Sequence, residues 1–180
     1  SIGLLIGYFR AHSKERDRFS FSLPLYKRLP LKTCIEHLKD SDIVLFSTYV
    51  WNEKISLSIA SYLKKLNPEV LIIFGGPSVP DMPGNYLKAH PFIDIVCHQE
   101  GERTLTALLD RYPIRDYSDV PGISYLGTQG EFRKNELLPR MRDLNVVPSP
   151  YLEGVFDNLM QANKNETWLA CWETNRGCPF

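Results

Sequence analysis

Three short stretches carry residue types that could bind a ligand, and each lies within three residues of the end of an apolar run. They are Ser47-Thr48, Gly75-Gly76-Pro77 and Glu100-Gly101-Glu102. A hydroxyl can hydrogen-bond a heteroaromatic nitrogen or a phosphate, and glycines leave room for a large ligand to reach the backbone. The spacing from Ser47 to Gly75 alone fits equally well any strand–helix–strand unit whose glycines only turn the chain. Whether these stretches form a binding site or ordinary turns depends on the helices and strands that position them.

In the middle of the chain, short apolar runs alternate with helical patterns. We expect strands at 43–46, 70–74 and 93–97, a helix from Asn52, which can cap it, to Leu66, a helix at 84–89, and one ending near Tyr112. This alternation predicts an α/β fold, a parallel sheet with helices on both faces. Loops that follow parallel strands meet at one edge of the sheet, where ligands bind. The three stretches are therefore expected to converge.

The flanking segments are less regular. We expect a helix at 2–12, a strand at 19–26 interrupted by Pro24, a helix at 31–39, a hairpin at 123–132, a proline-rich linker at 139–150, a short helix at 151–160, and a buried strand at 168–172 that places Cys171 in a core. These elements divide the chain into an α/β domain (1–115), a hairpin and linker region (116–165) and the start of a new unit (166–180).

Composition excludes several classes of protein. The 180 residues hold 21 basic and 21 acidic side chains, so neither a nucleic acid nor an anionic membrane surface is an expected partner. The longest apolar runs are far shorter than the roughly 20 residues that a membrane span needs, and no secretory signal is visible. The four scattered cysteines argue against a disulfide framework and favour the cytoplasm.

The order of the motifs resembles the cobalamin-binding domain of B12-dependent radical S-adenosylmethionine (SAM) enzymes, which has a flavodoxin-like fold. Six stretches carry the resemblance in sequence order: 47–52, 66–70, 75–77, 100–102, 121–123 and 148–151. The resemblance implies that the chain binds cobalamin. It also implies the residues that line the site: Ser47, Thr48, Tyr49, Trp51, Asn52, Gly75, Gly76, Pro77, Glu100, Gly101 and Glu102.

Two of these assignments have structural alternatives. An aromatic residue just before a helix, such as Trp51, is more often a core anchor than a platform for a ligand. His98, Glu100 and Glu102 could be taken for a metal cluster, but an acid such as Glu102 is favoured in the first turn of a helix by the helix dipole.

The Asp-x-His-x-x-Gly string that supplies a cobalt ligand in other cobalamin proteins does not occur here. If 2–12 is the first helix of the fold, the first strand lies upstream of Ser1.

The end of the sequence, Glu173–Phe180, resembles the opening of a radical SAM domain. There, three cysteines bind a [4Fe–4S] cluster and SAM binds the remaining iron. Cys178 would be the first of these metal ligands, although a buried or incidental cysteine is the structural alternative. The resemblance implies a downstream radical SAM domain in the same chain and a parent enzyme, with methyl transfer from methylcobalamin favoured over another radical reaction. Residues 1–180 alone are expected to hold neither cluster nor SAM and to be inactive.

Other functions remain open from the residues alone. The main alternative is a nucleotide-binding module, either Rossmann-like or glycosyltransferase-like. A dinucleotide site favours Gly-x-Gly-x-x-Gly after its first strand, a pattern that Gly75-Gly76-Pro77 lacks. A response-regulator or plain interaction domain would need acidic residues at the strand ends, where Ser47 and Gly75 stand instead.

Overall fold

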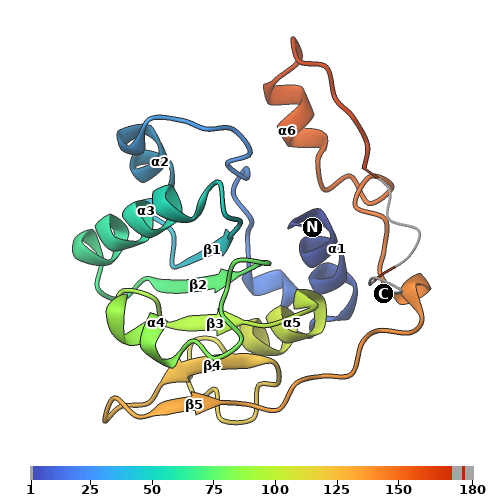
Figure 1. Ribbon diagram of the computed structural model, residues 1–180. Coiled ribbons are helices and arrows are strands. Elements are labelled where there is room, and N and C mark those ends of the chain that lie inside the picture. The colour runs from blue at the N-terminus through green and yellow to red at the C-terminus, as the bar shows by residue number, and fades with distance from the viewer. Residues whose placement is uncertain (1, 172–175, 177–180) are drawn as a thin grey trace.

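A five-stranded mixed sheet forms the centre of the structure, a computed structural model that describes residues 2–171 and Arg176 (Figure 1). The strands follow one another in chain order: β1 (Ile43–Ser47), β2 (Leu71–Gly75), β3 (Ile95–Cys97), β4 (Ile123–Leu126) and β5 (Phe132–Lys134). The first three are parallel, as predicted, and Ser47 lies opposite Gly75 at their carboxyl ends. The predicted hairpin is present as β4 and β5, and it folds back antiparallel onto β3, which makes the sheet mixed.

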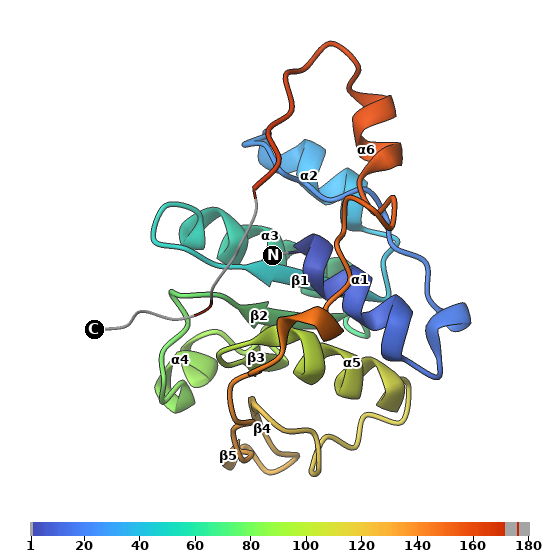
Figure 2. The same ribbon diagram turned by 90° about the vertical axis from the view of Figure 1, so that its right-hand side faces the viewer.

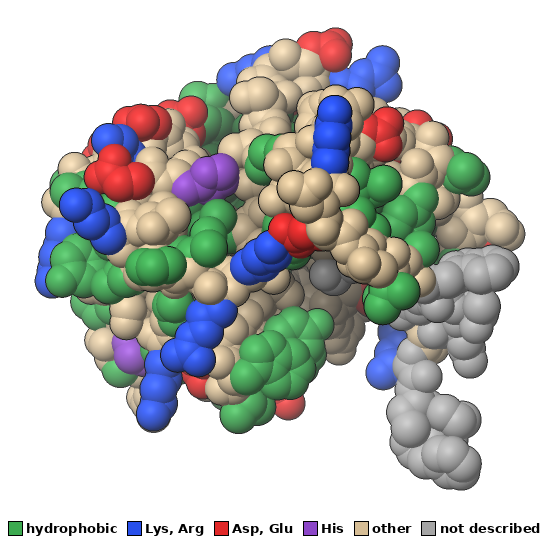
Figure 3. Space-filling view, turned by 90° about the horizontal axis from the view of Figure 1, so that it is seen from above, with side chains coloured by type: hydrophobic (Ala, Val, Ile, Leu, Met, Phe, Trp, Pro, Cys, Tyr) green, Lys and Arg blue, Asp and Glu red, His purple; other side chains and the backbone are tan. Residues whose placement is uncertain are grey.

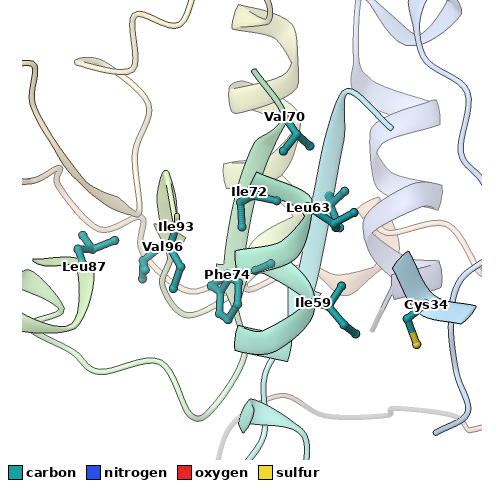
Figure 4. Close-up of a cluster of buried hydrophobic side chains, with 11 residues drawn as sticks. Cys34, Ile59, Leu63, Val70, Ile72, Phe74, Leu87, Ile93 and Val96 are labelled. Carbon is teal, nitrogen blue, oxygen red and sulfur yellow. The ribbon is translucent and has the colours of Figure 1, made fainter. Parts of the chain in front are cut away.

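Two groups of helices cover the two faces of the sheet. The helices α1 (Ile2–His12) and α5 (Gly101–Arg111) pack together on one face, while α2 (Leu31–Leu38), α3 (Glu53–Leu66) and α4 (Gly84–Ala89) cover the other. The period of two along β2 assigns its side chains: Ile72 and Phe74 join the α2–α4 cluster, whereas Leu71 and Ile73 join the α1/α5 cluster. Figure 4 shows the first of these cores. None of the described helices has the length and apolar character required to cross a membrane.

Two predicted strands are wrong. Residues 19–26 form no strand; instead, Phe19 and Phe21 pack edge-on against Phe9 of α1. In the strand predicted at 168–172, residues 168–171 likewise form no strand and Leu169 is 85% exposed, while Trp172 lies outside the described residues. A strand needs a neighbour that pairs with its backbone groups, and among the described residues neither segment has one. Cys171 is consequently exposed and is not a core residue.

The remaining predicted elements differ mainly in their boundaries. The helices predicted at 2–12, 31–39 and 84–89 are present, and the helix predicted at 151–160 begins later, as α6 (Asp157–Ala162), after a series of turns. Two short 3-10 helices stand at Arg16–Arg18 and Leu144–Val146. The second lies in the segment expected to be a linker.

A partly buried ion pair joins the starts of two strands to α3. The Nζ atom of Lys64 lies 2.8 Å from both carboxylate oxygens of Asp94 and 2.6 Å from the carbonyl oxygen of Val70. The same carboxylate accepts a hydrogen bond from the N–H of Ile72 at 2.7 Å. Asp94 therefore holds the end of α3, the start of β2 and the start of β3 together, at the edge of the sheet opposite the three loops.

We predict that Asp94→Asn lowers the free energy of unfolding by about 2 kcal/mol, because it removes a charge-assisted hydrogen-bond network and leaves Lys64 without its counter-ion. Denaturant unfolding followed by circular dichroism measures this. Glu69→Gln is the matched control, since that carboxylate pairs with Arg115 at the surface and is 82% exposed. Equal losses for the two variants would contradict the assignment.

Candidate functional site

The loops that follow β1, β2 and β3 converge at one edge of the sheet, as predicted, and border a cleft of about 1370 Å³. Eight of the eleven candidate residues line it: Ser47, Tyr49, Gly75, Gly76, Pro77, Glu100, Gly101 and Glu102. The other three, Thr48, Trp51 and Asn52, support these loops from outside the cleft.

The floor of the cleft is apolar and belongs to the α1/α5 face of the sheet. Leu45 and Ile73 precede Ser47 and Gly75 by two residues, so all four side-chain positions lie on the same face. Leu5 from α1 and Leu105 from α5 complete the floor. The cleft thus extends from the strand ends into a slot between two helices and the sheet, which suits a flat apolar group.

Gly76 allows the first two loops to touch. Its φ of +101° is one that side-chain-bearing residues rarely adopt, and a Cβ atom there would lie 2.6 Å from the carbonyl oxygen of Thr48. The side chain of Thr48 is buried and donates a hydrogen bond to the carbonyl oxygen of Gly75 at 2.7 Å. Thr48 therefore links the two loops, and its hydroxyl donates its hydrogen bond within the protein.

Gly75 differs from its neighbour. A Cβ atom at Gly75 would lie 3.6 Å from the Cβ atom of Cys97, an ordinary van der Waals distance. The fold could therefore accept a side chain at Gly75, and the absence of one leaves open volume in the cleft.

The loop after β1 is held by Asn52. The side-chain oxygen of Asn52 accepts a hydrogen bond from the N–H of Tyr49 at 2.7 Å, and its amide donates to the carbonyl oxygen of Ser47 at 2.9 Å. The predicted capping bond to α3 is absent, because the side chain turns back into the loop instead. Tyr49, fixed in this way, forms one side of the cleft.

Trp51 is neither a core anchor nor a lining residue. Its ring stacks on that of Tyr49, with centroids 4.5 Å apart and planes 13° from parallel, and the residue is 79% exposed. The space-filling view from above shows hydrophobic side chains standing at the surface among charged ones (Figure 3). Trp51 therefore packs against the outer face of Tyr49, the tyrosine that borders the cleft.

Residues 139–156 form a wall that the sequence did not predict as part of the site. In Figure 2 this segment passes in front of α5 and α1. The carboxylate of Glu100 accepts a hydrogen bond from the N–H of Met141 at 2.8 Å. A Cβ atom at Gly3 would lie 2.4 Å from the ring of Phe156, so α1 and the wall pack without a gap. The one sequence signal for this wall was the 148–151 motif, which overlaps the end of the segment taken for a linker.

The charges of the cleft balance. Glu100 and Glu102 line it together with Arg140 and Arg176, and the described lining contains no other charged side chain. Glu102 is buried in the first turn of α5 and forms an ion pair with Arg176. A cleft of this kind favours a large ligand with little net charge over a polyphosphate.

His98 belongs to the fold and not to a metal site. It is buried, and its ring nitrogen lies 2.8 Å from the hydroxyl oxygen of Ser124. Burial, and then the charge of Lys134, lower the pKa of His98, which keeps the ring neutral. Among the described residues, no three His, Cys, Asp or Glu side chains could hold a metal ion together. Cys178, the predicted cluster ligand, lies outside the described residues.

The comparisons agree with this geometry. Residues 24–109 match the B12 binding domain family. These residues thus form a B12-binding domain.

The chain is similar over 98% of its length to two curated proteins, and it spans 27% of each. It is 35% identical to the cobalamin-dependent radical SAM methyltransferase TokK of Streptomyces tokunonensis, and 34% identical to the 2-(S-pantetheinyl)-carbapenam-3-carboxylate methyltransferase of Streptantibioticus cattleyicolor. It is therefore a relative of B12-dependent radical SAM methyltransferases.

Solved structures share the fold. Apo OxsB, a cobalamin-dependent SAM radical enzyme, matches 86% of this chain and 21% of its own, with a TM-score of 0.64 and 23% identity. OxsB with aqua-cobalamin and SAM bound matches 70% of this chain and 18% of its own, with a TM-score of 0.54 and 25% identity.

We predict that Gly76→Ala destabilises the protein more than Gly130→Ala does. Both glycines have a positive φ, which costs another residue about 1–2 kcal/mol, but only Gly76 meets backbone atoms; nothing lies within 4 Å of a Cβ atom at Gly130. The difference in unfolding free energy between the two variants isolates the contact between the loops. Equal destabilisation would show that this contact is not needed.

We also predict that iodoacetamide at pH 8 modifies Cys171 and spares Cys97. Burial raises the pKa of the Cys97 thiol to about 12, so the reactive thiolate forms only as the pH approaches that value, whereas Cys171 is exposed. Peptide mass spectrometry reads the labelling, and denatured protein, in which both cysteines react, is the control. Rapid labelling of Cys97 in the folded protein would contradict the prediction.

Proposed function

We propose that this chain binds cobalamin in the cleft and serves as the cofactor module of a radical SAM methyltransferase. The observation that carries the proposal is the cleft itself, which has loops of the B12-binding family at one end, an apolar slot at the other and balanced charge. Ordinary ligand pockets measure about 300–1,000 Å³. The volume of about 1370 Å³ suits a ligand as large as cobalamin.

The residues fit the two parts of that ligand differently. Gly75 and the slot formed by Leu5, Leu45, Ile73 and Leu105 would take the aromatic base of the nucleotide tail. The hydroxyl of Ser47, at the mouth of the slot, would bond a polar atom of the tail. Tyr49 and the wall at 139–156 would face the corrin ring and its amide side chains, and would keep bulk water from that face.

A nucleotide is a poorer fit. Phosphate cradles use several backbone N–H groups at the start of a helix, but Pro77 has no N–H, and the helix after this loop begins only at Gly84. The balanced charge of the cleft also offers a polyphosphate no excess of positive groups.

The relatives support the proposed activity of the parent enzyme. TokK and the carbapenam carboxylate enzyme are methyltransferases, and OxsB binds cobalamin and SAM. Bound cobalamin would supply the methyl group, and the radical SAM part would supply a radical that activates the substrate. Cys178 would be one ligand of the [4Fe–4S] cluster of that part. The task of the described residues is to bind and orient cobalamin toward it.

The free thiols at Cys34, Cys97 and Cys171 support a reducing compartment, and we place the protein in the cytoplasm.

We predict that the full-length protein gives a saturable change in the visible spectrum with hydroxocobalamin, and that Gly75→Leu weakens the binding by roughly ten- to a hundredfold. The leucine would fill cleft volume, and overfilling a packed site costs about 1–3 kcal/mol. Gly75→Ala, whose methyl group fits beside Cys97, should change the affinity far less. Absence of a saturable change with the unsubstituted protein would rule out the proposed function.

A further inference from the structure

Glu102 and Arg176 form a buried ion pair between residues far apart in the sequence. Glu102 lies in the first turn of α5, and Arg176 lies two residues before Cys178. Their side chains are 6% and 12% exposed, and both residues line the cleft. The pair therefore joins the loop after β3 to the residues that lead to Cys178.

The chain before Arg176 reaches the cleft as a strap, residues 163–171, with weaker attachments. Glu166 pairs with Lys27 and accepts a hydrogen bond from the hydroxyl of Tyr26 at the surface. The hydroxyl of Tyr151 accepts a hydrogen bond from the N–H of Cys171 at 2.9 Å. Ala170 and Cys171 line the same cleft as Arg176.

The burial of the Glu102–Arg176 pair determines how much free energy its loss would cost. Exposed ion pairs such as Lys27–Glu166 contribute little to stability. A buried carboxylate without its partner is costly, so Glu102 strongly favours the position in which Arg176 meets it. Among the described ion pairs, Glu102–Arg176 is the most deeply buried.

We propose that Glu102 is a positioning residue, whose carboxylate fixes Arg176 and thereby sets where the strap lies against the cofactor cleft. The proposal rests on the proposed function, because it assigns the pair to the junction between the cobalamin site and the catalytic part. Occupancy of the cleft and placement of the strap are then coupled, since both involve Glu102.

The test is hydrogen exchange of the full-length protein without cobalamin, read at the strap. Glu102→Gln and Arg176→Gln should each speed exchange of the strap amides by about tenfold or more, and the double variant should be no faster than the faster single variant, because one interaction is lost in all three. Asp119→Asn, which removes the exposed Arg111–Asp119 pair at the C-terminal end of α5, is the matched control and should leave exchange at the strap unchanged.

Three outcomes would overturn the proposal. They are unchanged strap exchange in the single variants, additive effects in the double variant, and equal acceleration at the N–H of Ile72 in β2, which would indicate general destabilisation. Arg176→Gln leaves α5 intact, so the test does not depend on the folding of Glu102→Gln.

Hydroxocobalamin provides the second readout. It should slow exchange at the strap of the unsubstituted protein, and this slowing should be lost in Arg176→Gln. Persistence of the slowing in that variant would overturn the coupling. The proposed function fails separately, through the absence of a saturable spectral change in the unsubstituted protein, whatever the exchange of the variants shows.

Discussion

The approach of Gly76 to the backbone of Thr48 is the contact on which the site depends. β1 and β2 end side by side, with Ser47 opposite Gly75, and their loops must then pass one another within a few ångströms. A glycine at 76 permits this passage, and the buried hydroxyl of Thr48 secures it through the carbonyl oxygen of Gly75. With the two loops joined in this way, Ser47 and Gly75 both face the cleft.

The two faces of the sheet have different tasks. On one face, α2, α3 and α4 cover Ile72, Phe74 and Val96 in a closed core. On the other face, α1 and α5 cover Leu71 and Ile95, while the cleft lies over Leu45 and Ile73 and beside the carboxyl ends of the strands. The ion pair of Lys64 and Asp94 anchors the opposite ends of the strands. An ion pair therefore joins the amino ends of two strands to α3, and the carboxyl ends border the cleft.

The sequence predicted the parallel strands and the convergence of their loops, because short apolar runs and turn residues are local signals. It mispredicted features that depend on partners distant in the chain. The polarity of Asn52 indicated a helix cap, yet its side chain binds Tyr49 and Ser47. The apolar run at 168–171 resembled a strand, but a strand forms only where a neighbour pairs with it. The wall at 139–156 depends on contacts with α1 and Glu100 that no local pattern encodes.

The floor and the wall of the cleft are synthesised one after the other. The floor of the cleft is complete once α5 has left the ribosome, because Leu5, Leu45, Ile73 and Leu105 are all in place by then. Residues 139–156 emerge later and pack against α1, with Phe156 seated on Gly3. The nascent chain therefore contains the whole floor of the cleft before the wall that packs beside it has been synthesised.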